Sequence, residues 1–261
     1  MSILKIQKFE LMKKNKLILF LIFSIYLVSC NSNNSKFPTE KRYWTTNDYV
    51  KVIPELKYGF KSDEKLPSFN DPKTRLIVEK FTDPTNYKIV LDDKELGLKY
   101  KNEVSIEFFR LWKDMNSVYS AIDRKDMFIY EKEMIKVWHF GLGLELRYFK
   151  LGNDVILESS DDPNSNSVQR IINSNIETLI SNFNIYLDGI NDEKSLTNLG
   201  IVLFSEGIDK YFTELVELYP DANYSGMLRK IYLMEKKSNS EKIKSSLNNL
   251  KMLIESKNIN T

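Results

Sequence analysis

Two residue types that can do covalent or acid–base chemistry occur once each in the 261-residue chain, as Cys30 and His139. A single cysteine cannot form an intrachain disulfide, a C-x-x-C redox pair or a thiolate metal site. A lone histidine could act as a general base near neutral pH, but it cannot build an H-E-x-x-H zinc site. No G-x-S-x-G elbow accompanies it. We interpret His139 as a structural or surface residue, and we predict no catalytic residue and no metal ligand.

Carboxylates are the remaining candidates for chemistry. Glycoside hydrolysis uses two carboxyl groups that meet in space, so a carboxylate-dependent hydrolase stays an alternative. Neighbouring acids in polar loops or on exposed helix faces are ordinarily solvated, and we expect this of all the local pairs. These pairs are Asp161–Asp162, Glu131 with Glu133, and Asp192–Glu193. The pattern Gly141-Leu-Gly143 lacks the third glycine of a dinucleotide fingerprint, so no dissociable cofactor is predicted.

The residues before Cys30 have the pattern of an export signal. Lys13, Lys14 and Lys16 precede an apolar run over 17–28. The run has 12 residues, whereas a membrane-spanning helix needs roughly 20, so its length is typical of a signal peptide. Met12 lies directly before the first of these lysines and is the expected translation start. Leu27-Val28-Ser29-Cys30, at the end of the run, resembles the lipobox of bacterial lipoproteins.

The resemblance covers residues 12–30 and implies both processing and location. It implies cleavage between Ser29 and Cys30, diacylglycerol on the Cys30 thiol, and an acyl chain such as palmitate on the new amino terminus. Residues 1–29 are then a signal peptide, and residues 30–40 are a lipidated, flexible tether, because the segment 31–35 is polar. Asn31 in place of aspartate favours the outer membrane facing the periplasm, with the outer leaflet of the inner membrane as the alternative.

Removal of the signal changes the charge of the protein. The whole chain has a formal charge of +2, and residues 1–29 contain five lysines and one glutamate, so the mature chain has −2. Nucleic acid is therefore not an expected partner. Residues 151–227 contain 13 acids and three bases, while residues 228–257 contain eight bases and three acids. We expect these faces to be solvated and partly to neutralise each other, with an acidic surface for a cationic partner as the alternative.

Residues 36–69 hold prolines and scattered aromatics without a lasting period, which predicts an irregular N-terminal arm. Asp71-Pro72 and Asp83-Pro84 predict short helices over 72–81 and 84–91. Apolar residues spaced by three and four predict a helix over about 100–123 and a second from about 135, with Gly152 as its C-cap. Alternating residues also leave open a small β-hairpin near 142–157.

The C-terminal half has helical spacing almost throughout. Apolar stripes lie within 168–187, 208–219, 228–234 and 243–254, and Ser238-Asn-Ser-Glu241 predicts a capping box before the last. The turn-rich segment 161–167 is the expected internal boundary, between an N-terminal helical part over 41–160 and a C-terminal helical bundle over 161–261. The predicted fold class is therefore all-α: helical hairpins and a bundle with an irregular N-terminal arm.

Without a catalytic signature, the first hypothesis is a lipid-anchored binding protein for a protein partner, such as an immunity protein against a secreted toxin. The expected partner surface is acidic, and it comprises Asp161, Asp162, Asp188, Asp192 and Glu193. An accessory envelope lipoprotein of an assembly or transport machine is the alternative, besides the hydrolase. The oligomeric state has no signature in the sequence.

The lipobox predicts that Cys30→Ser abolishes metabolic labelling with palmitate and leaves an uncleaved or soluble form, because the only thiol is lost. Labelled fatty acid and immunoblots of membrane fractions measure both effects. Asn31→Ser is the matched control and should be labelled like the wild type. Palmitate that still labels the Cys30→Ser protein would refute the lipobox.

Overall fold

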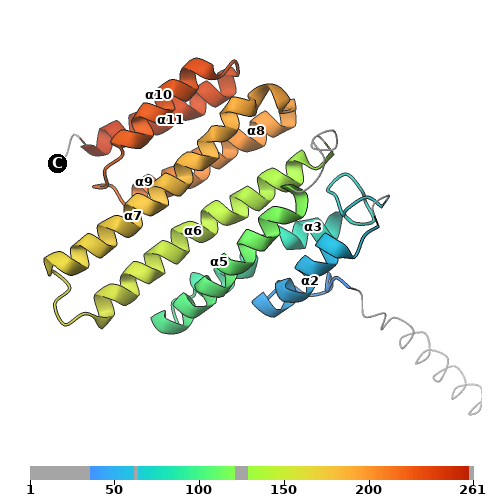
Figure 1. The fold of residues 1–261 in the computed structure, drawn as a ribbon, viewed down its shortest axis with the longest axis horizontal. Coiled ribbons are helices and arrows are strands. Elements are labelled where there is room, and N and C mark those ends of the chain that lie inside the picture. The colour runs from blue at the N-terminus through green and yellow to red at the C-terminus, as the bar shows by residue number, and fades with distance from the viewer. Residues whose placement is uncertain (1–35, 62–63, 121–128, 259–261) are drawn as a thin grey trace, which may run out of the picture. The chain divides into compact units, whose positions relative to one another are not determined.

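A computed structural model describes residues 36–61, 64–120 and 129–258. The chain divides into the units Met1–Pro38 and Thr39–Thr261, and the description below concerns the second unit. Its described elements are all helices, without a strand among them, which confirms the predicted all-α fold (Figure 1). No helix in these three ranges is both long and apolar enough to cross a membrane. The signal peptide and the lipobox lie outside the described residues.

Three short helices come first along the described chain. They are α2 (Thr46–Tyr58), α3 (Arg75–Phe81) and α4 (Thr85–Leu91). The prediction of an irregular arm is wrong for α2. Asp48 caps this helix by accepting a hydrogen bond of 2.9 Å from the backbone nitrogen of Thr45. The apolar face of α2 packs on α5 and holds the helix despite Pro54 within it.

The two Asp-Pro steps mark the beginnings of α3 and α4 only approximately. Asp71 Oδ2 accepts from the Thr74 hydroxyl at 2.9 Å, so residues 71–74 form a turn before α3 begins at Arg75. Asp83 Oδ1 accepts from the backbone nitrogen of Thr85 at 2.9 Å, the first residue of α4. Asp71 Oδ1 also accepts from the backbone nitrogen of Lys73 at 3.0 Å, so both aspartates satisfy backbone donors near a helix start, as expected of their residue type.

Three long helices lie side by side in the middle of the unit (Figure 1). They are α5 (Leu98–Ser120), α6 (Glu131–Ser159) and α7 (Asn166–Leu187). Helix α6 is continuous, so the alternative hairpin near 142–157 and the C-cap at Gly152 are both wrong. The cause is burial: residues 139–146 are all buried, because α5, α7 and α8 cover several sides of α6. A helix that is apolar nearly all round has no clear helical stripe and can be mistaken for a strand.

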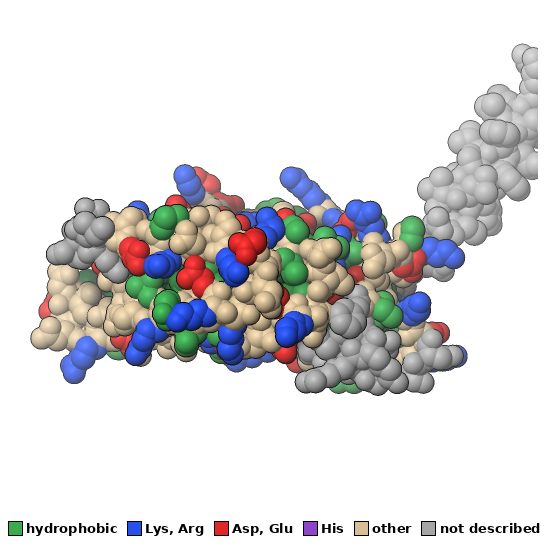
Figure 2. Space-filling model, turned by 90° about the horizontal axis from the view of Figure 1, so that it is seen from above, with side chains coloured by type: hydrophobic (Ala, Val, Ile, Leu, Met, Phe, Trp, Pro, Cys, Tyr) green, Lys and Arg blue, Asp and Glu red, His purple; other side chains and the backbone are tan. Residues whose placement is uncertain are grey.

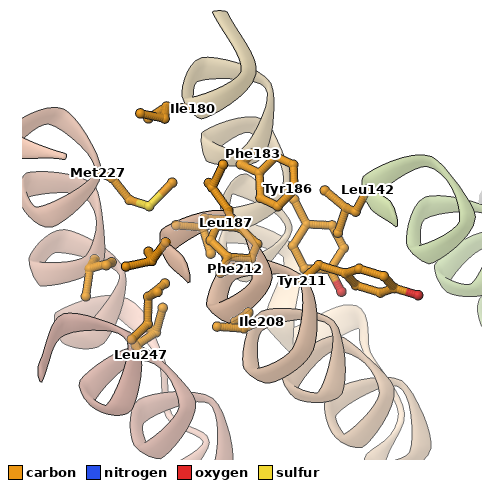
Figure 3. Packing of buried hydrophobic residues seen from close by; sticks show 14 of the residues in the cluster. Leu142, Ile180, Phe183, Tyr186, Leu187, Ile208, Tyr211, Phe212, Met227 and Leu247 are labelled. Carbon is orange, nitrogen blue, oxygen red and sulfur yellow. The ribbon is translucent and has the colours of Figure 1, made fainter. Parts of the chain in front are cut away.

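The C-terminal helices pack against α6 and α7 around one core. They are η2 (Asp188–Ser195), α8 (Asn198–Gly207), the π-helical η3 (Ile208–Phe212), α9 (Thr213–Leu218), α10 (Ser225–Lys237) and α11 (Glu241–Asn258). Figure 3 shows Phe183, Tyr186 and Phe212 meeting between these helices. Leu142 and Leu146 of α6 belong to the same core. The loop of residues 160–165 therefore connects helices that share a core.

The capping residue of α11 is Ser240 rather than Ser238. The Ser240 hydroxyl accepts from the backbone nitrogen of Ile243 at 3.3 Å. The Ser238 hydroxyl instead accepts from the backbone nitrogen of Ser240 at 3.1 Å. The N-cap is therefore two residues later than predicted, and it forms no capping box, because the third residue after Ser240 is Ile243 rather than a glutamate.

Arg147 ties α6 to segments on either side of it. Its Nε and Nη2 donate to the two carboxylate oxygens of Asp92 at 2.6 and 3.0 Å. Its Nη1 lies 3.1 Å from Glu214 Oε1 of α9. The guanidinium also stands over the Tyr87 ring, 5.7 Å from the centroid. The Arg147 side chain is only 15% exposed, so these contacts are better shielded from water than an ordinary surface pair.

We expect Arg147→Ala to lower the free energy of unfolding by about 2 kcal/mol, because two acids and a buried tyrosine ring lose their shared cation. Urea denaturation followed by circular dichroism measures this change. Lys150→Ala is the control: Lys150 pairs with Asp154 on the exposed side of α6, and its loss should cost at most about 0.5 kcal/mol. Equal effects of the two changes would contradict this role of Arg147.

Candidate functional site

The acids of the expected partner surface do not form one patch. Asp161 and Asp162 lie in the loop before α7, whereas Asp188, Asp192 and Glu193 follow its last residue. A helix of 22 residues separates the two groups by about 33 Å. Ser29 and Cys30, the other predicted site residues, lie outside the described residues.

Two of the three acids that follow α7 form contacts within the protein. Asp188 forms an ion pair with Lys230 of α10. Glu193 is buried, and its Oε1 accepts from the backbone nitrogen of Asn239 at 3.0 Å, so the expectation that it is solvated is wrong. Asp192 remains exposed. The acidic and the basic parts of the sequence thus meet at this end, as the charge pattern suggested.

His139 is buried in the helical core. Its Nε2 lies 3.2 Å from the Tyr186 hydroxyl, and a Cβ at Gly207 would overlap this pair. Burial, together with the nearby Lys136 and Lys210, lowers the pKa of His139 to about 3. The imidazole is therefore neutral at physiological pH and acts as a packing and hydrogen-bonding group.

Glu131 and Glu133 attach the first turn of α6 to other segments. Glu133 is buried, and its Oε1 accepts from the Ser68 hydroxyl at 2.8 Å and from the backbone nitrogen of Phe69 at 2.6 Å. The expectation of a solvated side chain is therefore wrong for Glu133. Glu131 accepts from the backbone nitrogen of Thr197 at 2.8 Å and from the Thr197 hydroxyl.

The most distinctive hollow surface lies along α6, facing α5 and α7 in its larger part and η2 and α8 in its smaller part. Two hollows share Trp138 and Gly189 in their linings, and we call them together the Trp138 groove. The larger has a volume of about 290 Å³ and the smaller about 80 Å³. The larger hollow is lined by two tryptophans and by polar groups from all three helices, among them Trp112, Asn116, Glu145, Asn182 and Tyr186.

Helical periodicity brings these side chains together. Trp138, Leu142 and Glu145 stand four and three residues apart on one face of α6. Asn182, Tyr186 and Gly189 have the same spacing across the end of α7. Trp112 and Asn116 are one turn apart on α5. Three helix faces therefore converge on one hollow, although the residues lie far apart in sequence.

Both indole rings are held in place. A Cβ at Gly141 would overlap the Trp112 ring, so the glycine allows this ring to lie directly on α6. Trp112 Nε1 donates to the Val137 carbonyl at 3.2 Å. Trp138 Nε1 donates to Asn116 Oδ1 at 3.1 Å, and its ring meets Tyr186 edge-on with centroids 6.0 Å apart. The aromatic walls are thus ordered before any ligand arrives.

Glu145 is the one acidic residue among the described residues that line the larger hollow. The residue is 3% exposed, and among the described residues its only hydrogen bond is from Asn182 Nδ2 to Oε1 at 3.3 Å. Burial raises the pKa of Glu145 to about 8, and the hydrogen bond from Asn182 offsets this effect only in part. The carboxyl is therefore mostly protonated near pH 7.

Sequence reasoning missed Glu145 and Asn182. The one signal available for Glu145 was its place as a single acid inside the apolar segment Phe140–Leu146. Asn182 carries no such signal, since asparagines are common throughout α7.

The charge of the Trp138 groove is one-sided. Glu131 and Asp192 line the smaller hollow and Glu145 the larger, while no lysine or arginine lines either within the part of the chain that the structure describes. Elsewhere the signs mix: on the face in Figure 2, Lys and Arg side chains alternate with Asp and Glu, and hydrophobic side chains show as separate patches. The groove is therefore a locally acidic and aromatic site.

Comparison of the chain with family models, with curated proteins and with solved structures gives no match. The function must therefore be inferred from the residues of the groove.

Gly141→Ala should displace the Trp112 ring and destabilise the protein by about 1–3 kcal/mol, because the added Cβ overlaps the indole. Tryptophan fluorescence and urea denaturation measure the two effects. Gly152→Ala in the same helix is the control, since a Cβ there meets nothing within 4 Å and should stabilise the protein by about 0.5–1 kcal/mol. If Gly141→Ala changes neither the fluorescence nor the free energy of unfolding, then α5 and α6 can move apart without cost, which contradicts the close contact of the Trp112 ring with Gly141.

Glu145 predicts a specific pH dependence of stability. Its pKa is about 8 in the folded protein against an ordinary value of 4.5, so folding favours the protonated form. The stability it contributes is full below about pH 4.5 and is lost as the pH rises through 8. Glu145→Gln has no group that ionises at this position. Its free energy of unfolding, relative to that of the wild type, should therefore increase by about 2–4 kcal/mol as the pH rises from 4.5 to 8.

Urea denaturation of both proteins across this pH range measures the difference. Glu158→Gln changes an exposed position of α6, so its free energy of unfolding should depend on pH in the same way as that of the wild type. A constant difference between wild type and Glu145→Gln would mean that the carboxyl titrates normally.

Proposed function

We propose that the mature protein is a lipid-anchored, periplasm-facing binding protein that holds a protein partner through the Trp138 groove. The observation that carries this proposal is the combination, in one groove, of two fixed indole rings with three carboxyl groups and no facing lysine or arginine among the described residues. Tryptophan is enriched among the residues that dominate protein–protein binding energy. A locally acidic groove fits a basic segment of a partner.

The size of the groove favours side chains of a protein over a free organic ligand. The larger hollow, about 290 Å³, lies at the lower limit of typical small-molecule pockets. Its smaller neighbour, about 80 Å³, adds room for little more than a small group. Two adjoining hollows that share Trp138 fit two neighbouring side chains of one extended or helical segment.

An immunity protein against a secreted toxin is the specific version that we favour. The lipobox would hold the protein at the membrane on the side where an incoming toxin arrives. The acidic groove would then cover a basic surface of the toxin. This version draws on the anchor, the slightly acidic mature chain and the groove together.

A carboxylate-dependent hydrolase is the second candidate, because a buried glutamic acid with a raised pKa is suited to general acid catalysis. Glycoside hydrolysis needs a second carboxyl facing the first across the substrate. Glu145 is the one carboxyl among the described residues that line the larger hollow, so this candidate ranks below binding. The third proposal, an accessory envelope lipoprotein, would use the exposed Tyr232 and Leu233 of α10 as an assembly surface.

The binding proposal predicts that immobilised mature protein retains a specific partner from periplasmic extract at low salt and releases it at high salt. Trp138→Leu should abolish retention, because it removes the wall shared by both hollows. Tyr232→Leu, a change at an exposed aromatic on α10, is the matched control and should retain the partner. Retention that is equal for both variants would refute a role for the groove, and loss with Tyr232→Leu alone would favour an envelope assembly.

A further inference from the structure

The larger hollow of the Trp138 groove joins an apolar aromatic wall to one buried carboxyl group. Trp112 and Trp138 form part of the wall, and Glu145 stands between α6 and α7. Aromatic faces attract cations through the ring quadrupole, most strongly for tryptophan. A carboxylate at the end of such a pocket provides the counter-charge that a desolvated cation needs.

The hydrogen-bonding groups of the hollow include an open acceptor on Glu145. Asn182 Nδ2 donates to Glu145 Oε1 at 3.3 Å, while Oε2 makes no hydrogen bond with any described residue. Asn116 uses Oδ1 to accept from Trp138. Lysine and arginine side chains carry donors and no acceptors, so the open acceptor on Glu145 matches them. An anionic ligand would face a carboxyl and two indole faces, and no lysine or arginine among the described residues that line the hollow.

On this geometry we propose that the hollow beside Glu145 binds the ammonium or guanidinium group of one lysine or arginine side chain of the protein partner. The inference rests on the proposed binding function and names the group that the groove recognises. The alkyl stem of the side chain would pack against the indole walls, and its charged end would reach Glu145 Oε2.

Binding of the cation is coupled to loss of one proton. Glu145 is mostly protonated in the empty site near pH 7, and the carboxylate that pairs with the cation is the ionised form. The carboxyl proton therefore passes to solvent as the cation enters, and the net charge of the hollow stays constant. Affinity should consequently rise with pH until Glu145 is ionised without a ligand, near pH 8.

Among the described residues that line the larger hollow, no other titratable group disturbs this coupling. Trp112 and Asn116 of α5 do not titrate, and neither do Asn182 and Ile185 of α7. The remaining titratable lining residue is Tyr186, whose burial raises its pKa well above 10, so it stays neutral. Its neighbour His139 is neutral as well, since its pKa is lowered to about 3.

The test uses the lipidated mature protein in detergent micelles and three blocked amino acids: N-acetyl-arginine methylamide, the lysine equivalent, and the glutamine equivalent as an uncharged control. NMR signals of the indole N–H groups report binding, even when it is weak. The cationic probes should shift the Trp112 and Trp138 signals, and the glutamine probe should not. Affinity should increase about tenfold per pH unit well below pH 8, and calorimetry in two buffers should detect one proton released.

Two variants test whether the cation binds to the carboxyl of Glu145 itself. Glu145→Gln keeps the shape of the side chain and should weaken cation binding by about tenfold or more and abolish its pH dependence. Glu158→Gln, at an exposed position of the same helix, should bind like the wild type. Binding that is unchanged in Glu145→Gln, or the absence of indole shifts up to the solubility limit of both cationic probes, overturns the proposal.

Failure of this inference and failure of the proposed function give different results. If the cations do not bind but Trp138→Leu still abolishes partner retention, the groove holds a partner without a cation site. If the cations bind but the Trp138→Leu variant retains the partner as the wild type does, the cation site exists and the partner binds elsewhere.

Discussion

The burial of α6 is the constraint on which the rest of the structure depends. Helices on several sides cover its middle, so each polar side chain on a covered face must find a partner inside the protein or give up its charge. Glu133 accepts from Ser68 and Phe69, and Arg147 binds Asp92 and Glu214. His139 loses its proton, and Glu145 keeps its own. Of these four, Glu145 is the one that lines a hollow, and it retains an unused hydrogen-bonding atom there.

The sequence predicted what depends on local periodicity. The stripes of apolar residues gave the all-α class and placed most helices, because spacings of three and four define one face. Prediction was wrong where local signals and packing disagree. Pro54 and scattered aromatics concealed α2, whose apolar face is stabilised by α5. The uniformly apolar middle of α6 resembled a hairpin.

The candidate site was harder to predict than the fold, because its residues come from three helices and only packing brings them together. Pairs of neighbouring acids led to the prediction that Asp161, Asp162 and Glu193 belong to one surface. In the structure Asp161 and Asp162 precede α7, whereas Glu193 follows it and is buried. Glu145 has no neighbouring acid in the sequence, and its raised pKa arises from its burial in the packed structure. The features that favour binding, two ordered indoles and a one-sided charge, are therefore properties of the packed structure.

The carboxyl ¹³C chemical shift of Glu145 as a function of pH, in selectively labelled mature protein, measures directly whether this carboxyl is protonated and responds to a cation. We expect a midpoint near 8 for the protein alone and a lower midpoint when a saturating cationic probe is present. A midpoint near 4.5 in the free protein, unchanged by the probe, would contradict this expectation: Glu145 would then be an ordinary ionised carboxylate, and the groove would hold no poised site for a cation.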